Sequence, residues 1–254
     1  MIYKTMPALL IRNAQQWPEK TALREKEFGI WNNISWSEYL LNVKNFALGL
    51  MALGFKKGDK VAIIGDNRPE WIYAELASQA LGSSSVGIYQ DSILKEISYI
   101  INASDSTVVV AEDQEQVDKL LDMKNEIKNV KKIVFTDPKG MRHYNDPLLV
   151  YFSDFCEEGK KYGNTHNGIF EKYVDNLSEN YTAQICTTSG TTGAPKLAML
   201  SHKNLITMAR NLGIVDPKYP TDEFVSFLPL PWVGEQMMTV ASSLLFGFTV
   251  NFPE

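Results

Sequence analysis

Cysteine is scarce in this chain of 254 residues, which contains only Cys156 and Cys186, thirty residues apart. The sequence has no C-x-x-C pair and no histidine at the spacing typical of metal ligands. These absences exclude a disulfide framework and the common kinds of zinc site. We therefore expect reduced thiols and a cytoplasmic location.

Clusters of basic residues are missing as well, since no run of lysine and arginine is longer than a pair. Acidic residues outnumber basic ones by 30 to 25, and the formal net charge is -5. Binding to the phosphate backbone of nucleic acid depends on gathered positive charge. We expect no nucleic-acid partner.

Long apolar runs are few. Residues 1–7 lack the apolar segment of a secretory signal, so no signal peptide is expected. Residues 236–253 carry no charge, but Ser242, Gly247 and Asn251 interrupt them, and a membrane span needs about 20 mostly apolar residues. A buried helix that runs into a buried strand explains this stretch better, and we expect no transmembrane segment.

The overall composition, with 44% hydrophobic and 22% charged residues, is typical of a globular protein with a large core. Short apolar runs alternate with amphipathic helical patterns along the first half of the chain. The runs are residues 61–64, 86–89, 108–110 and 133–135. Such alternation predicts an α/β fold, with a largely parallel sheet covered by helices on both faces.

The sequence pattern of the second half differs from the alternation in the first half. Residues 137–180 resemble a linker, with loops and one or two helices. Strands are then expected at 183–187, 197–200, 224–228 and 248–252, with helices beginning at Ser201 and covering 237–246. We divide the chain into a first α/β lobe, residues 1–180, and the start of a second, residues 181–254.

Helix starts are predicted from capping residues. Ser37 is expected to cap a helix that ends just before Gly54, and Asn67 to cap one that begins at Pro69. Ser201 is expected to cap a third.

Residues 187–196 read Thr-Thr-Ser-Gly-Thr-Thr-Gly-Ala-Pro-Lys and lie between two predicted strands. Glycines let backbone N–H groups form an anion-binding nest, hydroxyls add donors, and the lysine adds a positive charge. This is not a Walker A loop, because Ala194 and Pro195 follow Gly193, and the chain has no G-x-G-x-x-G. The residues predict a polyphosphate clamp, with a flexible turn between two strands as the alternative.

The full pattern Ser/Thr-Ser-Gly-Thr-Thr-Gly-x-Pro-Lys closely resembles the phosphate-binding signature of the adenylate-forming, or AMP-binding, superfamily. That superfamily includes acyl-CoA synthetases, luciferases and peptide-synthetase adenylation domains. Other segments resemble its long-chain fatty acid–CoA ligase branch and extend the resemblance over essentially the whole chain. They are WNNISWSEY at 31–39, GD at 58–59, DNRPEW at 66–71, GIY at 87–89, DQEQVDKLL at 113–121 and FLPL at 227–230.

The resemblance implies a role for each residue of the clamp. The phosphates of ATP would lie over Thr188, Ser189, Gly190, Thr191, Thr192 and Gly193. Lys196 would neutralise phosphate charge as the catalytic residue, and Thr191 would help to hold Mg²⁺. The implied reaction is attack of a fatty acid carboxylate on the α-phosphorus of ATP, which gives acyl-AMP and pyrophosphate, followed by thioester formation with coenzyme A.

Two departures from the family pattern stand out. Leu197 follows the lysine where members usually have glycine, which removes some backbone freedom but leaves the clamp intact. Many members have His or Phe beside the acyl group where this chain has Trp232. We expect Trp232, Val233 and Gly234 to line the acyl pocket, with an ordinary core position for Trp232 as the alternative.

Other signals for catalysis are absent. The chain has no G-x-S-x-G, and we expect His202 in the first turn of its helix rather than in a catalytic role. The family's adenine, ribose and C-terminal lysine motifs are not found before Glu254. We therefore expect the front part of a longer enzyme, without the C-terminal lid domain and inactive on its own.

Two other function classes stay open. One is a phosphotransferase or NTPase that uses the same clamp, which an Asp at a strand end beside the loop would favour. The other is a non-catalytic nucleotide-binding module. Homo-oligomers stay open as well, as does peripheral membrane contact, because long-chain substrates partition into bilayers.

Overall fold

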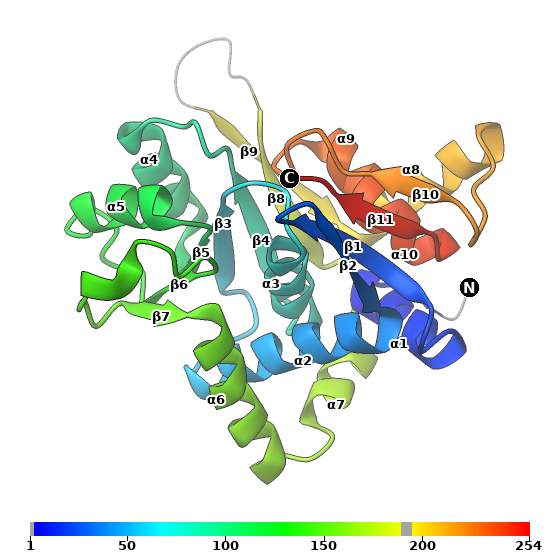
Figure 1. Ribbon diagram of the computed structural model, residues 1–254, viewed down its shortest axis with the longest axis horizontal. Helices are drawn as coiled ribbons and strands as arrows, with labels where there is room; N and C mark the ends of the chain where they lie inside the picture. The colour runs from blue at the N-terminus through cyan, green and yellow to red at the C-terminus, as the bar shows by residue number, and fades with distance from the viewer. Residues whose placement is uncertain (1–2, 189–194) are drawn as a thin grey trace.

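The computed structural model describes residues 3–188 and 195–254. Its central element is a seven-stranded sheet in the order β7-β6-β5-β3-β4-β8-β9 (Figure 1). In that order the strands are Leu149–Tyr151, Lys132–Phe135, Ser106–Ala111, Lys60–Ile64, Ser84–Ile88, Thr182–Thr188 and Lys196–Ser201. Neighbouring strands run parallel except for the antiparallel pair β8 and β9. The predicted α/β class with a largely parallel sheet is confirmed.

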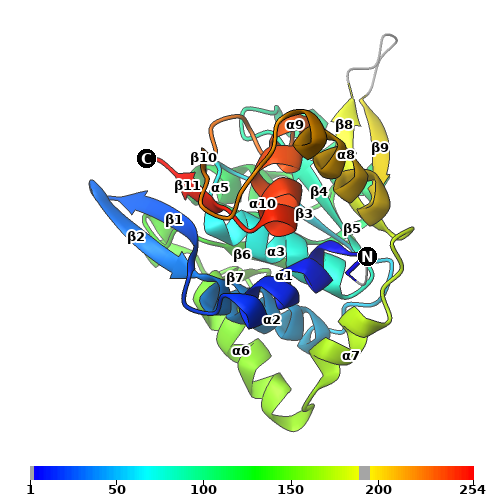
Figure 2. The ribbon, with the colours of Figure 1, turned by 90° about the vertical axis from the view of Figure 1, so that its right-hand side faces the viewer.

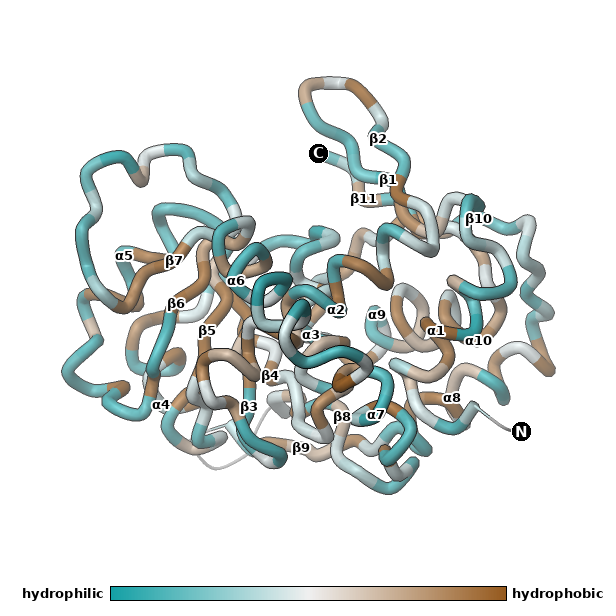
Figure 3. The backbone as a smooth tube through the Cα atoms, turned by 90° about the horizontal axis from the view of Figure 1, so that it is seen from below, coloured by the Kyte–Doolittle hydropathy of each residue, from teal (hydrophilic) through white to brown (hydrophobic). Residues whose placement is uncertain are grey.

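Helices cover both faces of this sheet. Side chains alternate along β3, so that Val61 and Ile63 join one core and Ala62 and Ile64 join the other. The first core packs under α2 (Trp36–Ala52), α3 (Pro69–Ala80) and α6 (Phe152–Thr165); the second packs under α4 (Leu94–Ser104) and α5 (Gln114–Asp122). Because both faces are buried, the central strands are apolar along their length, and β5 and β6 are mostly brown in Figure 3.

A second sheet joins the two ends of the chain. Its order is β10-β11-β1-β2, with strands Glu223–Val225, Thr249–Phe252, Thr21–Glu27 and Ile30–Ser35. β1 runs parallel to β11, with Leu23 opposite Val250, and forms an antiparallel hairpin with β2. Figure 3 shows this hairpin projecting from the rest of the molecule beside the C-terminus. Each sheet thus contains strands from both sides of residue 180, and the division into two lobes at that point stays a prediction.

The remaining helices are α1 (Met6–Gln16), the 3₁₀ turn η1 (Met141–His143), α7 (Ile169–Asp175), α8 (His202–Val215), α9 (Val233–Glu235), the π-helix η2 (Gln236–Ser242) and α10 (Ser243–Phe246). Of these, α1, α8 and α10 lie close together beside the second sheet, and α7 packs against α1, α2 and α3 (Figure 2). The predicted run of buried helix into buried strand over residues 236–253 is confirmed by η2, α10 and β11. Within the described residues, no helix has both the length and the apolar character required to span a bilayer.

Two of the predicted caps were wrong. α2 begins two residues earlier than expected, because Ser35 accepts from the Glu38 N–H and the Glu38 carboxylate accepts from the Ser35 N–H at 2.7 Å. Ser37 lies inside the helix and donates to the Pro18 carbonyl instead. Arg68, not Asn67, occupies the cap position of α3, and its side chain makes no capping hydrogen bond. The cap at Ser201 is confirmed by a reciprocal pair of hydrogen bonds with Asn204.

Residues 137–180 contain α6 and α7 as expected, together with the short strand β7, which the sequence did not indicate. The strand expected at 224–228 is shorter, since β10 ends at Val225. The Ser226 N–H still donates to the Asn251 carbonyl of β11 at 2.9 Å, after which the chain leaves the sheet. Ser226 and Leu228 accept hydrogen bonds from a side chain in another part of the chain, described below.

The contact between α2 and α6 depends on glycine. A Cβ atom at Gly159 of α6 would lie 2.0 Å from the Asn45 carbonyl oxygen and 2.5 Å from the Gly49 nitrogen, both in the α2 backbone. The two helices therefore touch backbone to backbone, and Phe46 stacks on Phe152 beside this contact.

We expect Gly159→Ala to destabilise the protein by about 1 to 3 kcal/mol, because the added methyl group forces the two helix backbones apart. Urea unfolding measures the change. Glu158→Ala, at the adjacent exposed position of the same helix, is the matched control. Equal stabilities for the two variants would contradict the close approach.

Candidate functional site

The β8–β9 hairpin carries the predicted phosphate clamp. Thr188, the last residue of β8, pairs in register with Lys196, the first residue of β9, and its hydroxyl donates to the Lys196 carbonyl at 3.4 Å. Both side chains are exposed. Five residues of the predicted clamp lie outside the described residues: Ser189, Gly190, Thr191, Thr192 and Gly193. The assignment of Thr191 to Mg²⁺ concerns one of them and stays a prediction.

The hairpin presents Lys196 as an available positive charge. Among residues 3–188 and 195–254, no carboxylate forms an ion pair with its ammonium group, and no acceptor bonds to it. β8 lies beside β4 in the sheet, so the clamp begins at the carboxyl edge of parallel strands. Ligands in open α/β sheets bind at this edge.

The predicted acyl-facing residues lie on the connection that leads from β10 into α9. Trp232 precedes α9, its side chain is 47% exposed, and its ring covers Gly234, where a Cβ atom would lie 2.2 Å from the indole. The alternative of an ordinary core tryptophan is therefore wrong. In the described part of the chain, no hydrogen bond or ring contact joins Trp232 to Thr188 or Lys196.

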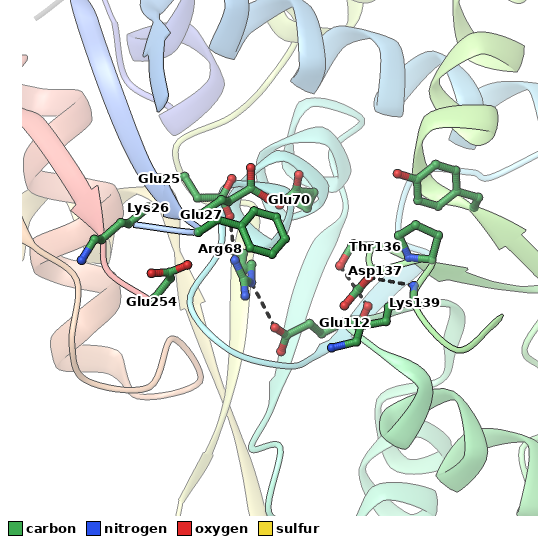
Figure 4. A pocket seen from close by; sticks show the side chains of 13 residues that line it. Glu25, Lys26, Glu27, Arg68, Glu70, Glu112, Thr136, Asp137, Lys139 and Glu254 are labelled. Atoms are coloured by element: carbon green, nitrogen blue, oxygen red, sulfur yellow. Dashed lines mark hydrogen bonds and ion pairs between the residues drawn. The ribbon is translucent and has the colours of Figure 1, made fainter. Parts of the chain in front are cut away.

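An acidic cavity of about 710 Å³ lies between the β1–β2 hairpin and the carboxyl ends of β3, β5 and β6 (Figure 4). Arg68 lies at its centre, with Nη1 3.0 Å from Glu25 and Nε 3.1 Å from Glu112. Burial alone would lower the pKa of Arg68, but its hydrogen bonds to the two carboxylates raise it. Burial also raises the pKa of Glu70, at the same cavity, to about 7.

Sequence reasoning missed this cavity, although a signal was present. Arg68, Glu112 and Asp137 each follow a predicted strand closely, and the ends of parallel strands meet at one edge. Glu25, on a hairpin far away in the sequence, gave no such signal. Within the described residues, no group of His, Cys, Asp and Glu is arranged to hold a metal ion.

A second cavity, of about 650 Å³, adjoins the first and shares Arg68 and Glu254 with it. Its walls come from the β3–α3 loop, the end of β4 and the connection before α9. Tyr89, Phe227, Pro229 and Pro231 give it apolar stretches of wall, which lie among polar and charged residues. The lining on this connection ends at Pro231, so the cavity does not include Trp232, Val233 or Gly234. This cavity can accept an apolar group beside the predicted acyl-facing residues.

A buried polar network lies behind that connection. The Glu75 carboxylate, which is fully buried in α3, accepts from Trp71 Nε1 at 3.3 Å, Gln79 Nε2 at 3.1 Å and Gln236 Nε2 at 2.9 Å. Burial raises the pKa of Glu75 to about 7 even though these three donors favour the charged form.

The two cysteine thiols and the His202 ring do not provide a nucleophile. Burial raises the pKa of both the Cys156 and the Cys186 thiol to about 12, so neither is a thiolate near neutral pH. Burial lowers the pKa of His202 to about 3, and the neutral ring accepts from the Met6 N–H at 3.3 Å. His202 lies in the first turn of α8, as predicted, where it holds the start of α1.

Comparison with known proteins extends these observations. A sequence profile of the family described as AMP-binding enzyme matches residues 10–254. The chain is 29% identical over 255 residues to a rat long-chain-fatty-acid–CoA ligase, ACSBG2, covering 98% of this chain and 38% of that protein. It is 28% identical to the human ligase ACSBG1, covering 98% of this chain and 34% of the relative. The chain thus spans less than two fifths of the length of these curated relatives.

Solved structures share the fold at lower identity. An anthranilate CoA ligase, AuaEII, solved with anthranoyl-AMP, superimposes with a TM-score of 0.80 at 19% identity, over all of this chain and 46% of that one. A fatty acyl CoA synthetase from Mycobacterium tuberculosis gives a TM-score of 0.74 at 20% identity, over 98% of this chain and 44% of that one.

The raised pKa of Glu75 predicts a pH-dependent stability. Because its pKa is about 7 in the folded protein and about 4.3 when unfolded, the stability from its protonated form is complete below pH 4.3 and lost as pH rises through 7. Relative to Glu75→Gln, the unsubstituted protein should lose about 3 kcal/mol over that interval. Urea unfolding at several pH values measures the difference. The stability of Glu96→Gln, at an exposed position, should follow that of the unsubstituted protein at every pH. If the stability of Glu75→Gln also runs parallel to that of the unsubstituted protein across this pH range, the raised pKa of Glu75 is refuted.

Proposed function

The chain belongs to the AMP-binding enzyme family, and from that premise we propose that it forms the front part of an ATP-dependent fatty acid–CoA ligase. The observation that carries the proposal is the register pair of Thr188 and Lys196, which brings both ends of the glycine- and threonine-rich segment together at the carboxyl edge of the sheet. A hydroxyl, and an ammonium group that has no partner among the described residues, suit a polyphosphate at the two ends.

In the proposed reaction, a fatty acid carboxylate oxygen attacks the α-phosphorus of ATP and pyrophosphate leaves. The thiol sulfur of coenzyme A then attacks the acyl carbonyl carbon of the acyl-AMP, loses its proton, and AMP leaves. The first step needs positioning and charge stabilisation rather than a protein nucleophile, which agrees with the protonated thiols and the neutral His202. Lys196 would hold phosphate charge, and the assignment of Thr191 to Mg²⁺ stays a prediction.

The second cavity, whose wall includes Phe227, Pro229 and Pro231 just before Trp232 in the chain, supports an acyl substrate. By the family resemblance, the adenine, ribose and C-terminal lysine motifs belong to segments other than these 254 residues. We therefore propose that the chain alone binds ATP weakly and makes no acyl-CoA, since orientation supplies roughly 7 to 11 kcal/mol of such a barrier. A cytoplasmic location, with peripheral membrane contact left open, belongs to the same proposal.

An NTPase is less well supported. The strand beside β8 is β4, which ends in Val86, Gly87 and Ile88, none of which is a carboxylate. The next acidic residue, Asp91, lies three positions further on and is exposed. A metal-binding Asp at the end of the neighbouring strand, as in NTPases, is therefore missing from this part of the described chain.

Lys196→Ala should reduce adenylation by about 10- to 1000-fold, as expected for the loss of one donor that stabilises developing charge. Fatty acid-dependent exchange of pyrophosphate into ATP measures this step, in a protein that joins this chain to the family's adenine, ribose and lysine segments. Lys203→Ala, at an exposed position on α8, is the control. Unchanged exchange in Lys196→Ala would remove the phosphate-clamp assignment.

Trp232→Ala should change the preference for acyl chain length more than the KM for ATP, because the exposed indole directly follows the wall of the second cavity at Pro231 and does not lie at the clamp. Exchange rates with a series of fatty acids measure the preference. Trp31→Ala, which removes another exposed tryptophan, should leave it unchanged. An unchanged preference in Trp232→Ala would remove the assignment of Trp232 to the acyl pocket.

A further inference from the structure

The connection before Trp232 is fastened to the β3–α3 loop by one asparagine. Asn67 Nδ2 donates to the Leu228 carbonyl at 2.7 Å and to Ser226 Oγ at 2.8 Å, while its Oδ1 accepts from the Leu230 N–H at 3.0 Å. The nitrogen and the oxygen of one side-chain amide thus bond to three residues of a segment that lies about 160 residues further along the chain. This explains why the chain leaves β10 early.

The carbonyl group of Leu230 is held by Gln236, which in turn bonds to Glu75 of α3. The Leu230 carbonyl accepts from Gln236 Nε2 at 2.9 Å, and the same nitrogen donates to the Glu75 carboxylate at 2.9 Å. Leu230 is fully buried, so both its N–H and its C=O depend on these partners. Asn67 directly, and Glu75 through Gln236, therefore fix the peptide groups on either side of Leu230, two residues before Trp232.

Other residues of the connection restrict its backbone further. Pro229 and Pro231 flank Leu230 and restrict its backbone. Pro231 lies directly on β4, because a Cβ atom at Gly87 would be 2.8 Å from its Cα. The Trp232 N–H then donates to the Pro229 carbonyl at 2.9 Å, which closes a turn.

The far side of the turn is also tied. Glu235 is buried, and its carboxylate accepts from the Ser226 hydroxyl at 2.7 Å and from Thr239. The π-helix η2 begins immediately afterwards. A π-helical segment inside a helix is uncommon and is often found at functional sites.

We propose that Asn67 and Glu75 are positioning residues that fix the backbone leading into Trp232, next to the second cavity, and thereby determine which acyl chains the protein accepts. The inference rests on the proposed function for its substrate but not for its geometry. Asn67 holds the Leu230 N–H directly and also lines the second cavity, whereas Glu75 acts through Gln236, which donates to the Leu230 carbonyl. Without these bonds, Pro229 and Pro231 of the cavity wall and the indole that follows them would lose their fixed position.

The first experiment measures the position of Trp232 without any substrate. The fluorescence of Trp232 is obtained as the difference between a protein and its Trp232→Phe counterpart, and acrylamide quenching reports its exposure. Asn67→Ala should change this quenching, whereas Ser78→Ala should not, although Ser78 is more deeply buried than Asn67, because the Ser78 hydroxyl donates only to the Glu75 carbonyl of the same helix. If both substitutions change it alike, the effect is general loosening and the proposal is overturned.

The second experiment measures specificity by exchange with short and long fatty acids. Asn67→Ala should change the ratio of kcat/KM for long and short chains by about fivefold or more, with the KM for ATP unchanged. In a Trp232→Phe background, the same substitution should add no further change, because its effect passes through the indole. An additive change, or an unchanged ratio, would overturn the proposal. If Asn67→Ala does not fold, Asn67→Asp, which keeps the acceptor and loses both donors, gives the same comparison.

Conservative replacement gives a further readout. Glu75→Gln keeps a hydrogen-bonding group at the site, and Gln236 can still bond to it, so quenching and acyl preference should stay near those of the unsubstituted protein. Glu75→Leu should change both, and equal behaviour of the two variants would refute a positioning role. If the unsubstituted protein shows no fatty acid-dependent exchange, the proposed function fails, while the quenching results still decide whether Asn67 and Glu75 position Trp232.

Discussion

Parallel alignment of six neighbouring strands is the constraint on which the rest of the structure depends. Because β7, β6, β5, β3, β4 and β8 run in one direction, their carboxyl ends meet at one edge of the sheet. The clamp begins at the end of β8, and the loops after β3, β4, β5 and β6 line the two cavities. The common direction of the strands thus brings residues that are far apart in sequence to one surface.

That edge also brings polar groups into the interior, and each must find partners there. Arg68 does so with two carboxylates, and Glu75 with three nitrogen donors. Asn67 satisfies a segment that has left its own sheet. The buried polar groups therefore connect the strand-end loops to the connection that carries Trp232, and packing alone would leave that connection much freer.

Local patterns were sufficient to predict most of the fold. Apolar runs gave the central strands and amphipathic periodicity gave the helices, because each signal lies within a dozen residues. The cap of α2 was wrong because Ser35 and Ser37 both precede the apolar stripe, and only the position of Glu38 decides between them. Asn67 was predicted as a cap because its partners lie at Ser226 to Leu230, beyond the reach of a local pattern. The acidic cavity could not be predicted for a similar reason, since Glu25 is 43 residues from Arg68.

The pairing of β1 with β11 has a consequence for synthesis of the chain. Arg24 and Asn251 lie 227 residues apart, so more than 200 residues that follow the hairpin must leave the ribosome before the four-stranded sheet can close. Until then the β1–β2 hairpin has an unpaired edge, and such edges invite association with other nascent chains. The α/β units around β3, β4 and β5 rely on contacts closer in sequence and can form earlier. Vectorial folding would therefore begin with these units, and the β1–β2 hairpin would dock later, once β11 has been made.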